Sequence, residues 1–369
     1  MIYLDNGATS FHKPYSVRWA MMNAMVCCGN PGRGGYREAM NGAEVVFSCR
    51  QTASKMFDCD PEQVVFTSSC THGLNIALGT LFGPGDRVVI SGFEHNAVTR
   101  TLKGLGCQIL VAGRKLFDWE DTLEEFRAAL DSGAQGAVFT HVSNVFGYIL
   151  PVEEMAKLCR ERGVPFVMDA AQSAGTMKIS LKGLGADFIA MPGHKGLLGP
   201  MGTGLLLCGT LPKPLIYGGT GSESRNQSMP DFLPDRGEAG TLNVPGIAGL
   251  QAGLRFLLQN HAEAIGSQEQ YCAEICARGL EKLGFQVFYG DHQCGTVSFL
   301  PGMDCEEAAA FFAGKGIALR AGLHCAPLAH ESAGTIETGT LRVSFGMDAD
   351  NVQVEAFLRV ASKLRPVES

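Results

Sequence analysis

The stretch FVMDAAQS, residues 166–173, places a short apolar run directly before the carboxylate of Asp169 and the amide of Gln172. Such a run is typical of a buried strand, and a carboxylate at the carboxyl end of a strand in an α/β sheet points into the ligand crevice. There Asp169 is suited to hold a cationic ring nitrogen or a metal ion. An Asp that caps the next helix explains the same spacing equally well.

Similar apolar runs recur on both sides of this stretch and alternate with amphipathic segments, of which 122–130 and 152–162 are examples. This alternation predicts βαβ units, and therefore an α/β fold with a mostly parallel sheet covered by helices. Ligand groups are then expected in the loops that leave the strands. The strands predicted in this way are 64–67, 88–91, 108–111, 137–141, 166–168, 188–191 and 204–207.

The last third of the chain is organised differently. Residues 211–241 are rich in Pro, Gly, Ser and Asn, which predicts a long loop. Beyond it the pattern predicts a smaller α+β unit, with helices at 244–259, 269–283, 305–314 and before 364, and strands at 286–289, 296–300 and 340–345. We expect a large domain over 1–250 and a small domain over 251–369, with the N-terminal segment packing against the small one.

The composition excludes several classes of protein. Hydrophobic residues make up 46% of the 369 residues and charged ones 18%, as in a folded protein with a sizeable core. Asp and Glu outnumber Lys and Arg by 37 to 30, which argues against nucleic-acid binding. No apolar stretch is long enough for a membrane span, and the start lacks a secretion signal. The 13 cysteines show no disulfide spacing, so we expect a reducing cytoplasm.

A lysine stands in a Gly-rich turn between two predicted strands, in MPGHKGLLGPMGTG, residues 191–204. Such a turn can desolvate Lys195 and lower its pKa, as an imine-forming amine requires. The spacing is wrong for a phosphate-binding P-loop. Taken alone, Lys195 is better explained as a surface lysine in a flexible loop. Together with Asp169 it supplies both groups that an aldehyde cofactor with a pyridine ring requires.

Two further segments place polar groups directly after predicted strands. In FTSSCTHG, residues 66–73, hydroxyls precede a helix predicted from Leu74, and a helix N-terminus of this kind binds phosphate. Capping of that helix by Ser69 or Thr71 is equally compatible with the segment. In FEHN, residues 93–96, His95 either stacks on a ligand ring or is an ordinary loop histidine.

A cysteine near the C-terminus has neighbours that suit a nucleophile. RAGLHCAP, residues 320–327, places Cys325 beside His324 and near Arg320, and positive neighbours favour the thiolate. An arbitrary cysteine among 13 is more often an inert core residue. Zinc ligation by His324, Cys325 and His330 is a further alternative, but no second Cys-x-x-Cys completes such a site, and we expect no metal.

Taken in order, these segments resemble the pyridoxal-phosphate enzymes of the class V aminotransferase family, and within it the cysteine desulfurases and the selenocysteine lyases. The resemblance covers nearly the whole chain, because it extends to residues 3–9, 30–33, 94–95, 240–243 and 341–342. It implies fold type I, with a seven-stranded, mostly parallel sheet in the large domain and an α+β C-terminal domain that carries Cys325. It also implies pyridoxal 5′-phosphate as the cofactor and a homodimer.

The resemblance implies a role for each matching residue. Lys195 would bind the cofactor aldehyde covalently, Asp169 would pair with the ring nitrogen, Gln172 would bond the ring hydroxyl, and His95 would stack on the ring and serve in catalysis. Groups that would hold the phosphate are Cys70, Thr71, His194 and, from the second subunit, Thr241. Groups that would bind the substrate carboxylate are Arg342, Arg320 and Asn144, the last of which would also border the cofactor.

The implied reaction converts L-cysteine to L-alanine. Cys325 would attack the substrate sulfur and keep it as a persulfide for an acceptor protein. Two alternatives stay open: a selenocysteine lyase that acts on L-selenocysteine, and a class V aminotransferase or lyase in which Cys325 is not catalytic. Pro192 stands where many relatives have a phosphate-binding Ser, so one phosphate contact would be missing or supplied from elsewhere.

Overall fold

The large sheet predicted from the sequence is present in the computed structural model, which describes residues 1–32 and 34–364. Its strands lie in the order β2 (Val64–Thr67), β8 (Gly204–Cys208), β7 (Phe188–Pro192), β6 (Phe166–Asp169), β5 (Gly136–Thr140), β3 (Arg87–Ser91) and β4 (Gln108–Ala112). Only β8 runs against its neighbours. The prediction of a mostly parallel, seven-stranded sheet is therefore confirmed. Arg33 and residues 365–369 of the predicted small domain lie outside the described residues.

Alternating side chains of the strands fill separate cores on the two faces of this sheet. On β5, Val138 packs into the core under α3 (Cys70–Leu81) and α4 (Asn96–Gly104). Its neighbour Phe139 packs into the larger core on the opposite face. The helices of that face are α2 (Arg37–Phe57), α5 (Trp119–Asp131), α6 (Val152–Arg162), α7 (Leu181–Leu184) and α8 (Val244–Gln259). The strands are consequently buried on both sides, and their carboxyl ends form the rim of a covered sheet.

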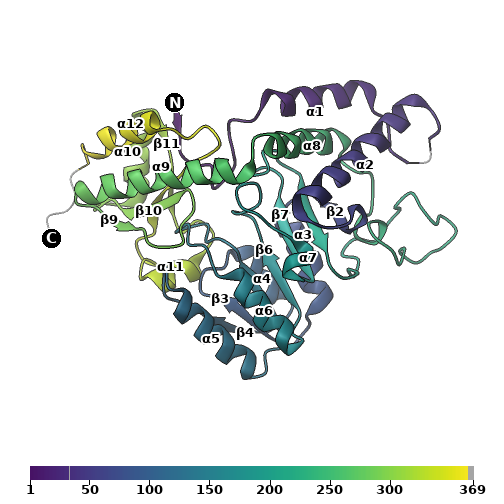
Figure 1. The fold of residues 1–369 in the computed structure, drawn as a ribbon, viewed down its shortest axis with the longest axis horizontal. Coiled ribbons are helices and arrows are strands. Elements are labelled where there is room, and N and C mark those ends of the chain that lie inside the picture. The colour runs from purple at the N-terminus through teal and green to yellow at the C-terminus, as the bar shows by residue number, and fades with distance from the viewer. Residues whose placement is uncertain (33, 365–369) are drawn as a thin grey trace.

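A second, smaller sheet lies beside the first (Figure 1). Its antiparallel strands are β12 (Arg320–Gly322), β13 (Thr340–Ser344), β10 (Thr296–Leu300) and β9 (Gln286–Phe288). The helices of this region are α9 (Ala262–Lys282), α10 (Cys305–Gly314), α11 (Pro327–Ala333) and α12 (Asn351–Ala361). The predicted division after residue 250 falls inside α8, and the two domains stay a prediction.

The N-terminus lies with these C-terminal elements (Figure 1). β1 (Ile2–Tyr3) pairs in parallel with β11 (Ile317–Ala318), and Leu4 is buried in the core of the small sheet. The carbonyl of Leu4 accepts the N–H of Ser344 at 2.8 Å. The first residues of the chain thus complete a unit built from its last third.

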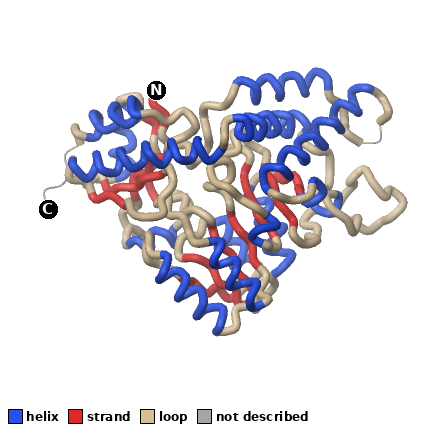
Figure 2. The backbone as a smooth tube through the Cα atoms, viewed as in Figure 1, coloured by secondary structure: helices blue, strands red, loops and turns tan. Residues whose placement is uncertain are grey.

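Two helices and the long loop complete the chain. Figure 2 shows the predicted loop of residues 211–241 as a tan excursion, interrupted only by the short 3-10 helix η2 (Asp235–Gly237); a second one, η1 (Pro61–Gln63), precedes β2. α1 (Tyr15–Cys27) and α2 were not among the predicted elements. The reason for α1 is that its exposed face is apolar too, so no polar stripe marks it; that face carries Tyr15, Trp19, Met22 and Val26. In the described part of the chain, no helix is long and apolar enough to cross a membrane.

A buried carboxyl joins the ends of two sheet strands. Oε1 of Glu94 accepts the hydroxyl of Ser91 at the end of β3 and the N–H of Thr140 at the end of β5, the latter at 2.8 Å. Oε2 of Glu94 is buried and has no hydrogen-bond partner among the described residues. Burial raises the pKa of this carboxyl to about 8. Glu94 is therefore neutral over much of the range in which an exposed Glu is charged.

We expect Gly175→Ala to destabilise the fold more than Gly163→Ala. Both glycines have positive φ angles, 99° and 62°, so each substitution carries the about 1–2 kcal/mol of a left-handed residue. A Cβ on Gly175 would also lie 2.2 Å from the carbonyl oxygen of Gly196, whereas one on Gly163 meets open space. Urea unfolding of both variants measures the difference, and equal losses of unfolding free energy would contradict the expected crowding.

The contribution of Glu94 to the stability of the fold should fall as pH rises from 5 to 8. Folded Glu94 keeps its proton up to about pH 8, whereas the unfolded carboxyl releases it near its ordinary pKa of 4.5. A retained proton is worth up to about 1.4 kcal/mol per pH unit. In thermal unfolding, the stability of the parent relative to Glu94→Gln, which keeps the neutral shape, should therefore fall over this range. Its stability relative to Glu62→Gln, an exposed control, should not change with pH. Parallel curves for parent and Glu94→Gln would show the carboxyl to be charged.

Candidate active site

A cavity of about 180 Å³ opens at the carboxyl ends of β6 and β7. It gathers residues that are far apart in the sequence. The predicted site residues that line it are Cys70, Thr71, His95, Asn144, Asp169, Gln172, His194 and Lys195. Lining residues that were not singled out as ligands include Ser69, Thr140, Val142 and Ala171. The position agrees with the expectation that ligand groups follow the strands.

Asp169 is the buried anion of this cavity. It is the last residue of β6, and its Oδ1 accepts the N–H of Ala171 at 2.8 Å and the thiol of Cys70 at 3.4 Å. Burial, followed by the nearby carboxylate, holds the pKa of Cys70 well above its usual range, so the thiol keeps the proton that it donates. The alternative in which Asp169 caps the next helix is wrong, because the next helix, α7, begins at Leu181 and is capped by Ser180.

Lys195 lies in the turn after β7, next to β6 in the sheet. Burial lowers the pKa of its amine, and the carboxylate of Asp169 opposes that shift. The backbone of the turn is fixed, because the Lys195 carbonyl accepts the hydroxyl of Ser10 at 3.1 Å from outside the turn and the N–H of Leu198 at 2.9 Å from within it. Lys195 is therefore a held, partly desolvated amine and not a mobile surface lysine.

His95 lines the cavity, and a hydrogen bond fixes the orientation of its ring. It is the N-cap of α4, and its Nδ1 accepts the N–H of Ala97 at 3.0 Å. Since Nδ1 is the acceptor, the neutral ring carries its proton on Nε2. Burial lowers the pKa of His95, which favours that neutral ring.

The end of the cavity near α3 has the character of an anion site. α3 begins at Cys70 and not at the predicted Leu74, because the Ser69 side chain accepts the N–H of His72 at 3.2 Å and caps the helix one turn earlier. His194 lines the same cavity, and its buried Nδ1 has no hydrogen-bond partner among the described residues. Burial lowers the pKa of His194 to about 4, so the ring is neutral. Pro192, which offers no donor, also lines this cavity.

Cys325 lies outside the cavity but is tied to its wall. The thiol is exposed, and the backbone of His324 and Cys325 is left-handed, with φ of 49° and 58°. The Cys325 carbonyl accepts the N–H of Asn96, which follows His95, at 2.8 Å. The His324 carbonyl accepts the side-chain amide of Asn144 at 2.8 Å. The first bond connects the cysteine loop, residues 320–327, to the residue after His95, and the second connects it to Asn144, which lines the cavity.

The remaining predicted residues do not line the cavity either. Arg342 on β13 is buried, and its Nη1 donates to the carbonyl of Asn144 at 2.8 Å. Its Nη2 donates to Oδ1 of Asp5 at 2.7 Å, a partner that was not predicted because it lies 337 positions away and in no recognisable pattern. Arg320 is exposed on β12, and Thr241 is exposed in the loop before α8.

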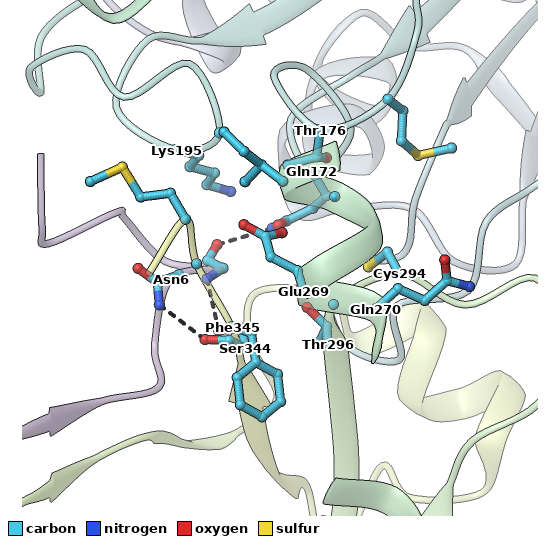
Figure 3. A pocket seen from close by; sticks show the side chains of 18 of the residues that line it. Asn6, Gln172, Thr176, Lys195, Glu269, Gln270, Cys294, Thr296, Ser344 and Phe345 are labelled. Atoms are coloured by element: carbon cyan, nitrogen blue, oxygen red, sulfur yellow. Dashed lines mark hydrogen bonds between the residues drawn. The ribbon is translucent and has the colours of Figure 1, made fainter. Parts of the chain in front are cut away.

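A second cavity, of about 330 Å³, adjoins the first on the side of the small sheet (Figure 3). Lys195 and Gln172 line both cavities. Glu269 of α9 also lines the second cavity, and burial raises its pKa to about 8. Sequence reasoning missed Glu269, because only the packing of α9 brings it there. In the described part of the chain, no three His, Cys, Asp or Glu side chains cluster to hold a metal ion.

The chain is similar to known proteins over nearly its whole length. The family model "Aminotransferase class-V" matches residues 2–357. A probable cysteine desulfurase of Pyrococcus abyssi is 33% identical over 99% of this chain and 94% of its own length. The apo structure of a cysteine desulfurase from Thermococcus onnurineus is 31% identical, with a TM-score of 0.89 over 99% of this chain and 94% of its own.

A more distantly related structure supports the assignment of the fold only. It is a lysine variant of the lyase C-DES, 21% identical, with a TM-score of 0.82 over 98% of this chain and 96% of its own, and it contains glycine covalently linked to its PLP cofactor. The family resemblance and the fold class predicted from the sequence are thereby confirmed. The chain belongs to the class V aminotransferase family, and its fold is that of the fold type I pyridoxal-phosphate enzymes.

Proposed function

We propose that this chain is a cysteine desulfurase, which converts L-cysteine to L-alanine and keeps the sulfur as a persulfide on Cys325. The observation that carries the proposal is the exposed Cys325 thiol, bonded through its backbone to the segment that carries His95, beside a cavity with Lys195 and Asp169. The desulfurase names of relatives at 31–33% identity support it. An exposed thiol in this place has no use in simple amino-group transfer.

The residues of the first cavity fit pyridoxal 5′-phosphate. Lys195 would bind its aldehyde, Asp169 would pair with the ring nitrogen, and His95 would stack on the ring. Gln172, which in this structure donates to the Gly7 carbonyl at 3.0 Å, would turn to the ring hydroxyl. Asn144 would border the ring while it holds the cysteine loop.

The anion site at α3 fits the phosphate. The unpartnered Nδ1 of the neutral His194 can carry the ring proton and donate it to a phosphate oxygen. The hydroxyl of Thr71 and the N-terminus of α3, to which Cys70 belongs, add donors and a favourable dipole. Ser69 and Thr71 stand near the position where Pro192 leaves a donor missing.

The chain's own residues divide the reaction between them. Bound pyridoxal phosphate supplies an electrophilic aldehyde and an electron-withdrawing ring. Arg342, with Arg320 and Asn144, holds the substrate carboxylate, and the Nζ of Lys195 moves the Cα proton. Cys325 Sγ attacks the substrate sulfur: the S–S bond forms, the Cβ–S bond breaks with its electron pair left on Cβ, and Cβ takes a proton to give alanine. An acceptor protein then removes the sulfur from Cys325.

The assembly and compartment belong to the same proposal. We place the chain in a homodimer, with Thr241 of each protomer completing the phosphate site of the other. Support comes from Thr241, which is exposed and does not line the cavity of its own chain, and from the apolar surface of α1. All 13 cysteines are unpaired, as expected in a reducing cytoplasm.

The Lys195→Ala and Cys325→Ser variants should separate cofactor binding from sulfur transfer. Lys195→Ala should lose the cofactor absorbance that stays with the denatured chain after borohydride reduction, because no lysine amine is left to bind the aldehyde covalently. Cys325→Ser should keep that absorbance and release sulfide from L-cysteine at least about a hundredfold more slowly, because a hydroxyl cannot replace the thiolate. The measurements are an absorbance spectrum and assays of alanine and sulfide, with Cys107→Ser as a control at a thiol far from the cavity.

The same assays decide against the proposal if they fail in defined ways. Undiminished sulfide release by Cys325→Ser would make the thiol a bystander, and keto acid without sulfide would indicate an aminotransferase. Turnover of L-selenocysteine far above that of L-cysteine would indicate a selenocysteine lyase. A parent that takes up no cofactor would contradict the desulfurase, aminotransferase and selenocysteine lyase functions alike.

Mixed dimers should test the contribution of Thr241. Thr241→Glu places a negative charge against the phosphate of the neighbouring site, so it should inactivate the homodimer, as Lys195→Ala does. A dimer with one protomer of each kind has one intact site and should recover about half of the parent activity. Activity of co-expressed, tandem-purified mixed dimers measures this. A mixed dimer of the double variant Lys195→Ala/Thr241→Glu with the parent carries the same two changes but no intact site, and it is the control. No recovery, or a monomeric parent in sedimentation, would contradict the shared site.

A further inference from the structure

Two arginines lie opposite each other on adjacent strands of the small sheet. Arg320 of β12 and Arg342 of β13 are directly opposite partners in the antiparallel register, so their side chains leave the same face of the sheet. The side chain of Arg342 is only 2% exposed. Burial lowers the pKa of Arg342, the carboxylate of Asp5 opposes that shift, and Arg320 adds to it. Like charges at this spacing repel, and the pair therefore needs negative partners.

The N-terminal segment brings one such partner and fixes it in place. Oδ1 of Asp5 accepts Nη2 of Arg342 at 2.7 Å. On either side of Asp5, the Leu4 carbonyl accepts the Ser344 N–H, and the Gly7 N–H donates to the Ser344 hydroxyl, both at 2.8 Å. Figure 3 shows this segment bonded to Ser344 and Gln172. Asp5 is therefore held against Arg342 by the backbone and not by a flexible loop.

The segment can approach so closely because residue 7 is glycine. A Cβ on Gly7 would lie 3.2 Å from Cζ of Arg342 and from the Ser344 hydroxyl. The guanidinium is thus enclosed by Asp5 on one side and by the Asn144 carbonyl on another. Its Nε is buried and has no hydrogen-bond partner among the described residues, so it keeps a donor for a ligand.

The formal charges around Arg320 and Arg342 add up to one net positive charge. The two arginines carry two positive charges and Asp5 removes one. The other ionisable groups that face them are Tyr3, which is neutral, His324, whose pKa burial lowers to about 2, and the opposed pair Lys195 and Asp169. One positive charge is left for a ligand.

We propose that Asp5 is a specificity-determining residue, which holds Arg342 in place and limits the site to ligands with one carboxylate. The inference rests on the proposed function, since it takes Arg342 as the ligand of the substrate carboxylate. A single carboxylate brings the balance of charges to zero. A ligand with a second anionic group leaves an excess negative charge in a partly buried site, and its affinity falls accordingly.

The test uses the cofactor-loaded protein and binding, not turnover. Isothermal titration calorimetry gives the Kd of L-alanine and of L-aspartate, which differ by one carboxylate, for parent and Asp5→Asn. Asn keeps an oxygen that accepts from Arg342 but has no charge. We expect the affinity for L-aspartate, relative to that for L-alanine, to rise about threefold to tenfold in Asp5→Asn, the size of one partly screened charge interaction.

Two further variants keep the test decisive. Asp5→Glu retains the charge and should retain the selectivity of the parent. Asp348→Asn removes one negative charge from the loop after β13, where Asp348 pairs with His12 at 2.7 Å, and should also leave the selectivity unchanged. If Asp5→Asn is folded too poorly to titrate, a parent-like selectivity in Asp5→Ala, assayed in its place, would overturn the proposal as well.

Failure of this inference and failure of the proposed function give different results. An unchanged ratio of the two Kd values in Asp5→Asn overturns the role of Asp5, whatever the enzyme does with cysteine. A parent that binds both amino acids but releases no sulfide leaves the charge balance intact and removes the desulfurase assignment. Equal gains for alanine and aspartate would show that Asp5 only weakens carboxylate binding in general, which also overturns the selectivity.

Discussion

The burial of one carboxylate and one amine at adjacent strand ends is the constraint on which the rest of this structure depends. Asp169 ends β6, and Lys195 follows the neighbouring strand β7. Neither charge is stable in a covered sheet unless other groups compensate it. Cys70 and Ala171 donate to Asp169, and the carboxylate of Asp169 in turn favours the charged amine of Lys195. The helices, the cysteine loop and the N-terminal segment all supply or position such groups.

Much of the fold could be predicted because apolar runs and amphipathic helices alternate regularly around Asp169. All seven strands of the large sheet were expected to within one residue of their observed ends. α1 escaped prediction because it is apolar on its exposed face as well. The start of α3 was placed too late because its cap, Ser69, lies inside a run of small polar residues with several equally good caps.

The residues of the site also fall into those that the sequence predicts and those that it does not. Residues that directly follow strands, such as His95 and Lys195, could be identified from the sequence, because the topology of a parallel sheet brings strand ends together. Asp5 and Glu269 could not, because their positions depend on contacts between the first residues, α9 and the small sheet. No local pattern records a contact that spans 337 positions.

The pairing of the N-terminus with the small sheet also affects how the chain folds during its synthesis. Leu4 belongs to a core whose other members lie between residues 272 and 364, and Ile2 pairs with Ile317. On the ribosome, the N-terminal residues therefore wait until nearly the whole chain has been translated, which at about 5–20 residues per second takes roughly 20–70 s. During that interval the apolar first residues have no native partner. Chaperones that bind exposed apolar segments are therefore needed most at the beginning of the nascent chain.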